Sequence, residues 1–189
     1  MAIHRSDSGR APDTRELAKL ARSARQGDTE AFLELIESLK GALYRTARTI
    51  LRNDEDCADA LQDTIVGAYQ AIRSLREPAH VQTWLYRILI NACNTILQKR
   101  QRQSLPGTLP EPAADSPVYQ DVELREAIDR LEEPLRLVVV LVYLEDMRIA
   151  DAAAILGISE GAAKMRLKRS KAQLRSWLAP ADMGRERSS

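Results

Sequence analysis

The lysines and arginines near the C-terminus of this 189-residue chain carry its clearest chemical signature. Between Ser159 and Arg175 there are six basic residues and one acidic residue. Cationic side chains gathered on one helix can neutralise DNA phosphates, and residues at the start of such a helix can reach base edges in the major groove. The chemistry that this stretch indicates is therefore nucleic-acid binding.

The stretch 147–174 must position these side chains, and its pattern predicts two helices joined by a tight turn. The first helix ends before Gly157, where a left-handed C-cap is favourable. Ser159 stands at the N-cap of the second helix, with Glu160 in its first turn. The inward stripe of the second helix is Ala163, Leu167, Ser170 and Leu174. This pattern is typical of a helix-turn-helix, although an ordinary helical hairpin with a solvated basic face fits the stretch alone.

Charge is segregated along the chain rather than present in excess. The formal net charge is only +1, and residues 121–158, just before the basic helix, contain nine acidic and four basic residues. Any DNA affinity must therefore come from one face of the molecule. The hydrophobic content of 44% is ample for a core, and the scarcity of aromatic residues favours an all-helical fold.

The residues needed for metal binding or catalysis do not converge anywhere in the sequence. Cys57 and Cys93 are 36 positions apart, and the only histidines are His4 and His80. We expect both cysteines to be buried small apolar residues in a reducing cytosol. No metal site, cofactor or enzymatic activity is predicted, and the absence of a long apolar run predicts a cytoplasmic protein without membrane insertion.

The N-terminal half predicts four helices. Asp13 opens the first, Asp28 caps the second, and Asp54 begins the third. The third helix is predicted to bury Ala58, Leu61, Ile65, Ala68 and Ile72, and to expose Asp59, Gln62, Asp63 and Gln70. After a loop over 73–83, the fourth helix, 82–102, is predicted to bury Leu85, Ile88, Leu89, Ala92 and Ile96.

Residues 103–120 contain four prolines and no lysine or arginine, which predicts a linker between two domains. Beyond it we expect a helix over 121–132 and an apolar helix over 135–144, with Pro134 in its first turn. The predicted fold is all-α, with two small four-helix domains. The predicted segments are an N-terminal arm (1–12), a first domain (13–102), the linker (103–120), a second domain (121–178) and a polar tail (179–189).

Five motifs in order resemble the extracytoplasmic-function (ECF) sigma factors, group IV of the sigma-70 family of bacterial RNA polymerase subunits. They are Gly27-Asp28 with Ala31-Phe32, the acidic stretch DEDCADALQDTIV (54–66), WLYRI (84–88) with Asn91, LEEPLRLVVVLVYL (131–144), and ILGISEGAAKMRLKRSKAQLR (155–175). The sequence departs from the family pattern at Ala58, Ile65 and Ala162-Ala163. The resemblance implies a region 2-like first domain and a region 4-like second domain.

The resemblance also implies the partners and the residues that meet them. The acidic helix is expected to dock on the clamp coiled coil of core RNA polymerase through Asp56, Asp59, Gln62 and Asp63. The loop and helix after it are expected to meet the −10 promoter element through His80, Thr83, Tyr86, Asn91, Lys99, Arg100 and Arg102. Trp84 is expected in the core, whereas Tyr86 is left open between packing and stacking on a base.

The second domain is expected to read the −35 element of promoter DNA. Its implied contacts are Ser159, Glu160, Gly161, Lys164, Met165, Arg166, Lys168, Arg169 and Lys171. Met165 with Lys164 or Lys168 are candidates for base edges, and Arg166, Arg169, Lys171 and Arg175 for phosphates.

The implied function is that of a sigma factor that binds core polymerase and directs transcription initiation at −10 and −35 elements. An anti-sigma factor is an expected partner, and the unbound chain is expected to be a monomer. Two alternatives stay open at this point: a stand-alone helix-turn-helix regulator, and a helical sigma-like adaptor without promoter activity. The acidic helix favours the sigma factor, because a stand-alone regulator explains the C-terminal half but not this helix.

Overall fold

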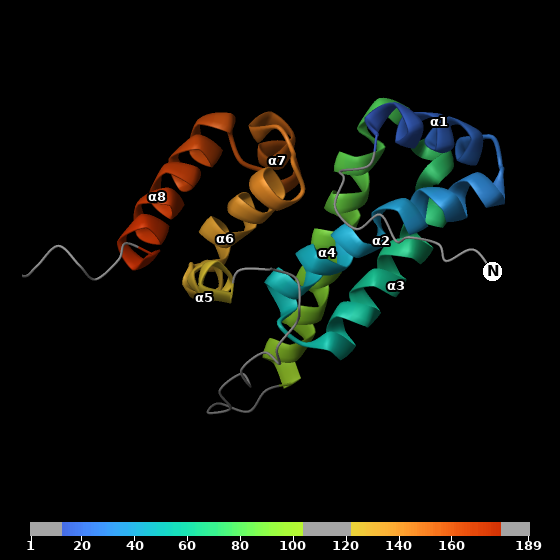
Figure 1. Ribbon diagram of the computed structural model, residues 1–189. Coiled ribbons are helices and arrows are strands. Elements are labelled where there is room, and N and C mark those ends of the chain that lie inside the picture. The colour runs from blue at the N-terminus through green and yellow to red at the C-terminus, as the bar shows by residue number, and fades with distance from the viewer. Residues whose placement is uncertain (1–12, 104–121, 179–189) are drawn as a thin grey trace, which may run out of the picture. The chain divides into compact units, whose positions relative to one another are not determined.

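The computed structural model describes residues 13–103 and 122–178, and the regular elements in these two ranges are all helical (Figure 1). The chain divides between Leu109 and Pro110 into two compact units, which we call unit 1 and unit 2. The α-helices of unit 1 are α1 (Thr14–Arg25), α2 (Thr29–Leu51), α3 (Asp54–Ala71) and α4 (Val81–Gln103). Those of unit 2 are α5 (Val122–Arg130), α6 (Glu133–Val139), α7 (Ile149–Leu156) and α8 (Glu160–Leu178).

The predicted all-α fold with two helical domains is thus confirmed for the described residues. The predicted arm (1–12), the linker apart from its first residue, and the tail (179–189) lie outside them. The domain boundaries stay predictions. No helix within 13–103 or 122–178 is both long and apolar enough to cross a membrane.

Side-chain caps start the first three helices of unit 1. Asp13 accepts a hydrogen bond from Arg15 N at 2.9 Å, and Asp28 accepts one from Ala31 N at 3.1 Å. Asn53 accepts one from Asp56 N at 3.0 Å. Each cap satisfies a backbone N–H group that the first helical turn leaves without a partner. These polar residues therefore set where the helices begin.

Helix α3 packs against both α2 and α4 in unit 1 (Figure 1). Asp56, at the start of α3, pairs with Arg100 near the end of α4, whereas Gly67 near the end of α3 lies beside Ile88. The two helices therefore run antiparallel. The loop between them contains the short 3₁₀ turns η1 (Ile72–Ser74) and η2 (Pro78–His80).

The predicted buried stripe of α3 is partly wrong. Leu61, Ala68 and Ile72 are buried as predicted, but Ala58 is exposed and Ile65 is only half-buried. The buried face of the helix is Cys57, Ala60, Leu61, Thr64 and Ala68. Because α3 lies against two helices, small residues such as Cys57 and Ala60 face its neighbours, and a pattern of large apolar residues does not reveal them.

The predicted buried face of α4 is also partly wrong. Leu85 and Leu89 are buried as predicted, whereas Ile88, Ala92 and Ile96 are half-buried. The buried face of this helix includes Val81, Leu85, Tyr86, Leu89, Ile90 and Cys93. Packing against both α2 and α3 explains the wider buried arc.

The core of unit 2 forms where α5, α6 and α8 meet. Its buried members include Ile128, Leu131, Leu135, Val138, Val139 and Leu167. The predicted helix 135–144 differs in one respect: α6 ends at Val139 and continues as the π-helical turn η3 (Val140–Leu144). The hydrogen bond from Glu145 N to Val140 O, at 3.0 Å, closes this wider turn.

Candidate functional site

The acidic face of α3 is the first candidate binding surface. Asp59, Gln62 and Asp63 are all exposed on this helix, and Asp59 lies one turn before Asp63. Side chains at i, i+3 and i+4 share a helix face, so these three residues present their oxygens together. This face can accept hydrogen bonds from a basic partner surface.

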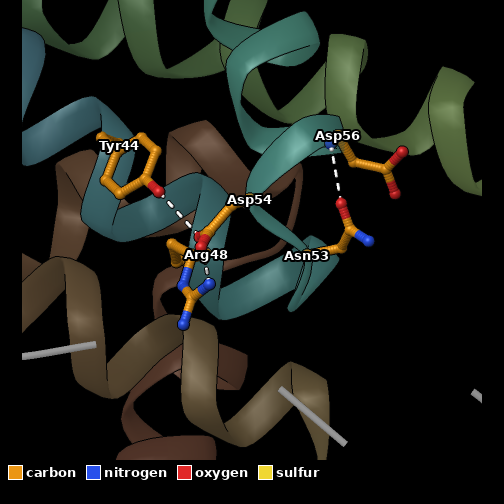
Figure 2. Close-up of polar contacts among 5 residues, drawn as sticks. All are labelled: Tyr44, Arg48, Asn53, Asp54 and Asp56. Atoms are coloured by element: carbon orange, nitrogen blue, oxygen red, sulfur yellow. Dashed lines mark hydrogen bonds and ion pairs between the residues drawn. The ribbon is translucent and has the colours of Figure 1, made fainter. Parts of the chain in front are cut away.

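Asp54, the first residue of α3, belongs to a cluster that fastens α3 to the preceding helix. Tyr44 Oη donates a hydrogen bond to Asp54 Oδ1 at 2.8 Å, and Arg48 forms an ion pair with the same oxygen (Figure 2). Burial, together with the hydrogen bond to Asp54, raises the pKa of Tyr44. The Tyr44–Arg48 spacing of one helical turn is the sequence signal of this cluster, and the expected contacts of the acidic helix do not include it.

Asp56 differs from the other members of the acidic set because it is already partnered. Arg100 Nη2 lies 2.8 Å from Asp56 Oδ2, and the Asp56 side chain is only 14% exposed. Oδ2 is buried and accepts no hydrogen bond from the described residues. The ion pair with Arg100 therefore offsets the cost of burying its charge. Burial raises the pKa of Asp56, and Asp59 and Glu55 add to this effect, while the Arg100 guanidinium opposes it.

The residues predicted to meet −10 DNA lie in two groups at the two ends of α4. His80 is exposed and Thr83 is half-buried near the start of the helix, whereas Lys99, Arg100 and Arg102 are exposed near its end. Lys99 lies sixteen positions after Thr83, or about 24 Å at 1.5 Å per helical residue. Exposed Asn91 lies between the groups. A DNA strand would have to follow the length of α4 to touch both ends.

Tyr86 cannot serve as an exposed stacking platform, and its place in the predicted −10 set is corrected. Its side chain is 0% exposed, within the core of unit 1. Trp84, which was expected in the core, is half-buried. The open choice for Tyr86 is thus settled as packing: residues two apart on a helix point to nearly opposite sides, and only the packing of α4 decides which ring faces inward.

Helix α8 presents the second candidate surface. Gly157 ends α7 with φ of +64°, and Ser159 Oγ accepts a hydrogen bond from Ala162 N at 3.1 Å. Ser170 Oγ lies 3.3 Å from Leu135 O and so fastens α8 to α6. The helix-turn-helix geometry predicted from the sequence is present, and it orients the outer face of α8.

The outer face of α8 carries most of the predicted −35 contacts. Exposed residues of this set are Ser159, Glu160, Gly161, Lys164, Met165, Lys168, Arg169 and Lys171, whereas Arg166 is half-buried. Lys164 pairs with Glu160 at 2.6 Å, which leaves Lys168 and Arg169 as the cations without an ion pair at the centre of the face, among the described residues. Lys171 lies over the ring of Tyr143, 5.0 Å from its centroid.

Cys57 and Cys93 form no disulfide, and both are buried in unit 1. Burial raises the pKa of Cys57 to about 11, so its thiol is protonated at neutral pH. Their burial agrees with the predicted role as small apolar residues. Among the described residues, no group of three or more metal-ligating side chains is placed to hold an ion.

Comparisons with known proteins agree with this architecture. Residues 35–103 match the family model described as Sigma-70 region 2, and residues 121–174 match Sigma-70, region 4. The chain is 35% identical over 176 residues to the ECF RNA polymerase sigma factor SigM of Mycobacterium tuberculosis, covering 90% of this chain and 88% of the relative. It is 27% identical over 161 residues to the RNA polymerase sigma factor SigV of Bacillus subtilis, covering 82% and 96%.

Solved structures show the same likeness. The sigma factor RpoE of Bartonella quintana, in complex with the anti-sigma factor NepR, aligns with a TM-score of 0.70 and 26% identity, covering 79% of this chain and 98% of RpoE. CnrH, in complex with the cytosolic domain of CnrY, aligns with a TM-score of 0.64 and 26% identity, covering 86% and 97%. The chain belongs to the ECF group of sigma-70 factors, proteins without enzymatic activity that recognise promoters and direct transcription initiation.

Proposed function

We propose that this sigma factor works through two surfaces, the acidic face of α3 for core RNA polymerase and the outer face of α8 for −35 DNA. The observation that carries the proposal is the separation of charge: exposed acceptors gather on α3, and exposed cations gather on α8. The acidic face of α3 attracts a basic protein surface, and the cationic face of α8 attracts the phosphates of a nucleic acid.

The polymerase contact is assigned to Asp59, Gln62 and Asp63. Their exposure on one face supports this role, and Asp56 joins them only when its ion pair with Arg100 opens. The −10 contacts are assigned to His80, Thr83, Asn91, Lys99, Arg100 and Arg102. The helix end that carries the last three is the more cationic, so it is assigned to phosphates.

The −35 contacts are assigned to the outer face of α8. Residues near the start of a recognition helix reach base edges, which assigns Lys164, Met165 and Lys168 to bases. Arg169 and Lys171, further along the helix, meet phosphates. The 53% exposure of Met165 supports an apolar contact with a base.

Run-off transcription with purified components tests this proposal. Core RNA polymerase from the same bacterium, the full chain and genomic promoter fragments should yield a specific transcript that core polymerase alone does not produce. Asp59→Asn combined with Asp63→Asn should weaken retention on immobilised core polymerase, while Gln70→Ala on the same helix serves as the matched exposed control. Failure of the wild-type chain to bind core polymerase would contradict the proposal.

We also infer that the chain acts in the cytoplasm, where RNA polymerase works, and that an anti-sigma factor holds it when it is inactive. The solved relative RpoE is bound to such a factor. Isolation of the chain from its own cells, without induction, should recover a second protein that blocks run-off transcription when added back. Recovery of an uncomplexed, active chain under those conditions would contradict this inference.

A further inference from the structure

Asp56 and Arg100 are bound to each other, although the proposed function assigns them to different partners. Asp56 belongs to the polymerase-facing set on α3, and Arg100 belongs to the DNA-facing group at the end of α4. Their charged atoms are 2.8 Å apart, with 14% of the Asp56 side chain and 46% of the Arg100 side chain exposed. Neither group can give its full charge to an outside partner while the pair is closed.

The neighbouring charges of both sets are arranged differently. Lys99 and Arg102 flank Arg100 and form no ion pair with another described residue, and the same holds for Asp59 and Asp63 beside Asp56. The antiparallel packing of α3 and α4 brings one member of each set to the same place. Figure 2 shows that the Asp56 carboxylate points away from the Tyr44–Arg48–Asp54 cluster, so Arg48 does not compensate it.

Breaking this pair without replacing a partner is unfavourable for Asp56. Its carboxylate is largely buried and its Oδ2 accepts no other hydrogen bond from the described residues. Burial already raises its pKa, which means that the ionised form is poorly solvated. A carboxylate in this position is stabilised by an incoming cation, and Arg100 in turn is stabilised by an incoming anion. Exchange of partners is therefore favoured over simple opening.

We propose that the Asp56–Arg100 ion pair couples polymerase docking to promoter binding in this sigma factor. A basic polymerase side chain that binds Asp56 releases Arg100 to a DNA phosphate, and a phosphate that binds Arg100 releases Asp56 to polymerase. This inference rests on the proposed function. Because coupling between two ligands is reciprocal, each partner strengthens the binding of the other by the same factor.

DNA binding by the free chain is the first test, with a labelled single-stranded oligothymidine as the probe and fluorescence anisotropy at low salt as the readout. Asp56→Asn should raise the affinity by about two- to fivefold, the range expected for release of a partly exposed ion pair. Asp59→Asn removes the same charge from the same helix and reports the effect of net charge alone. An Asp56→Asn gain no larger than the Asp59→Asn gain would overturn the proposal.

A double-mutant cycle assigns the gain to the pair. In a chain that already carries Arg100→Gln, Asp56→Asn should produce no gain beyond that of Asp59→Asn, because no arginine is left to release. A gain of the same size in both backgrounds would show that Asp56 acts independently of Arg100 and would also overturn the proposal.

Binding to core polymerase without DNA tests the other direction and uses a different variant. Arg100→Gln should strengthen retention on core polymerase, because Asp56 is released; damage to the fold would weaken it instead. Lys99→Gln and Arg102→Gln remove the same charge on either side and serve as controls. If the wild-type chain binds core polymerase but Arg100→Gln gains no more than these controls, the coupling fails and the proposed function stands. If the wild-type chain does not bind core polymerase, both fail.

Discussion

The two units place their charged residues in different ways. In unit 1, two ion pairs join separate helices, in addition to the pairs within α1 and α2: Arg48 on α2 binds Asp54 on α3, and Arg100 on α4 binds Asp56 on α3. In unit 2, the pair between Lys164 and Glu160 stays within one turn of α8. Charged residues of unit 1 therefore hold the fold as well as offering contacts, whereas those of α8 mainly project from a face that the apolar core orients.

This difference predicts how substitutions in each unit affect stability and binding. A side chain that joins two helices affects both of them when it is removed, so its effects are not independent of its partner. A side chain on a solvated helix face affects mainly its own contact. Substitutions in unit 1 should therefore interact with one another, and substitutions along α8 should add.

The largest effect is expected for Tyr86→Ala in unit 1. Its ring is completely buried, and truncation of a buried aromatic residue costs about 3–5 kcal/mol. Chemical unfolding followed by circular dichroism should show the loss of stability in unit 1 and an unchanged transition for unit 2. Tyr86→Phe keeps the ring and serves as the control, and Trp84→Ala should cost less. Equal losses for Trp84→Ala and Tyr86→Ala would contradict the assignment of the two rings.

The N-caps provide the next comparison because each unit has one at a functional helix. Asn53→Ala and Ser159→Ala should each destabilise their own unit by about 0.5–2 kcal/mol, since a backbone N–H loses its acceptor. Asn53→Asp and Ser159→Thr keep an acceptor and should recover most of the loss. If either alanine variant shifted the unfolding transitions of both units, the prediction that each cap stabilises only its own unit would be contradicted.

Substitutions of cations on α8 should have smaller effects, and these effects should be additive. Arg169→Gln and Lys171→Gln should each reduce the slope of log affinity against log salt by about 1, because each phosphate contact releases counterions. Their losses in binding free energy should add within about 0.5 kcal/mol in the double variant. The measurement is anisotropy of promoter DNA with the holoenzyme over a salt series. Strong non-additivity would make α8 behave like unit 1.

The smallest effect is expected for the cysteines, which should be inert in the folded chain. Burial raises the pKa of Cys57 to about 11, so the reactive thiolate is scarce at neutral pH and increases only as the pH approaches that value. Iodoacetamide should label neither Cys57 nor Cys93 before unfolding and both after it, as mass spectrometry can measure. Rapid labelling of the native chain would reveal local opening between α3 and α4.

Local signals in the sequence determined most of the helices and their limits. Asp13, Asp28, Asn53 and Ser159 could be identified as caps or breaks because capping depends on a side chain and on backbone groups two or three residues away. The left-handed Gly157 and the inward stripe of α8 follow from equally local rules. The motif order was sufficient to identify the ECF sigma family, and the comparisons confirmed it.

Tertiary packing decided the features that depend on residues far apart in the chain. Periodicity along α3 and α4 did not show that small Cys57 lies inside, that Ala58 lies outside, or that Tyr86 rather than Trp84 is buried, because each helix has two neighbours. Nor could it show that Asp56 meets Arg100, since an ion pair between residues so distant in sequence forms only when α3 and α4 pack antiparallel. The sequence determined which charges are available, and the packing of the helices decided which of them bind each other.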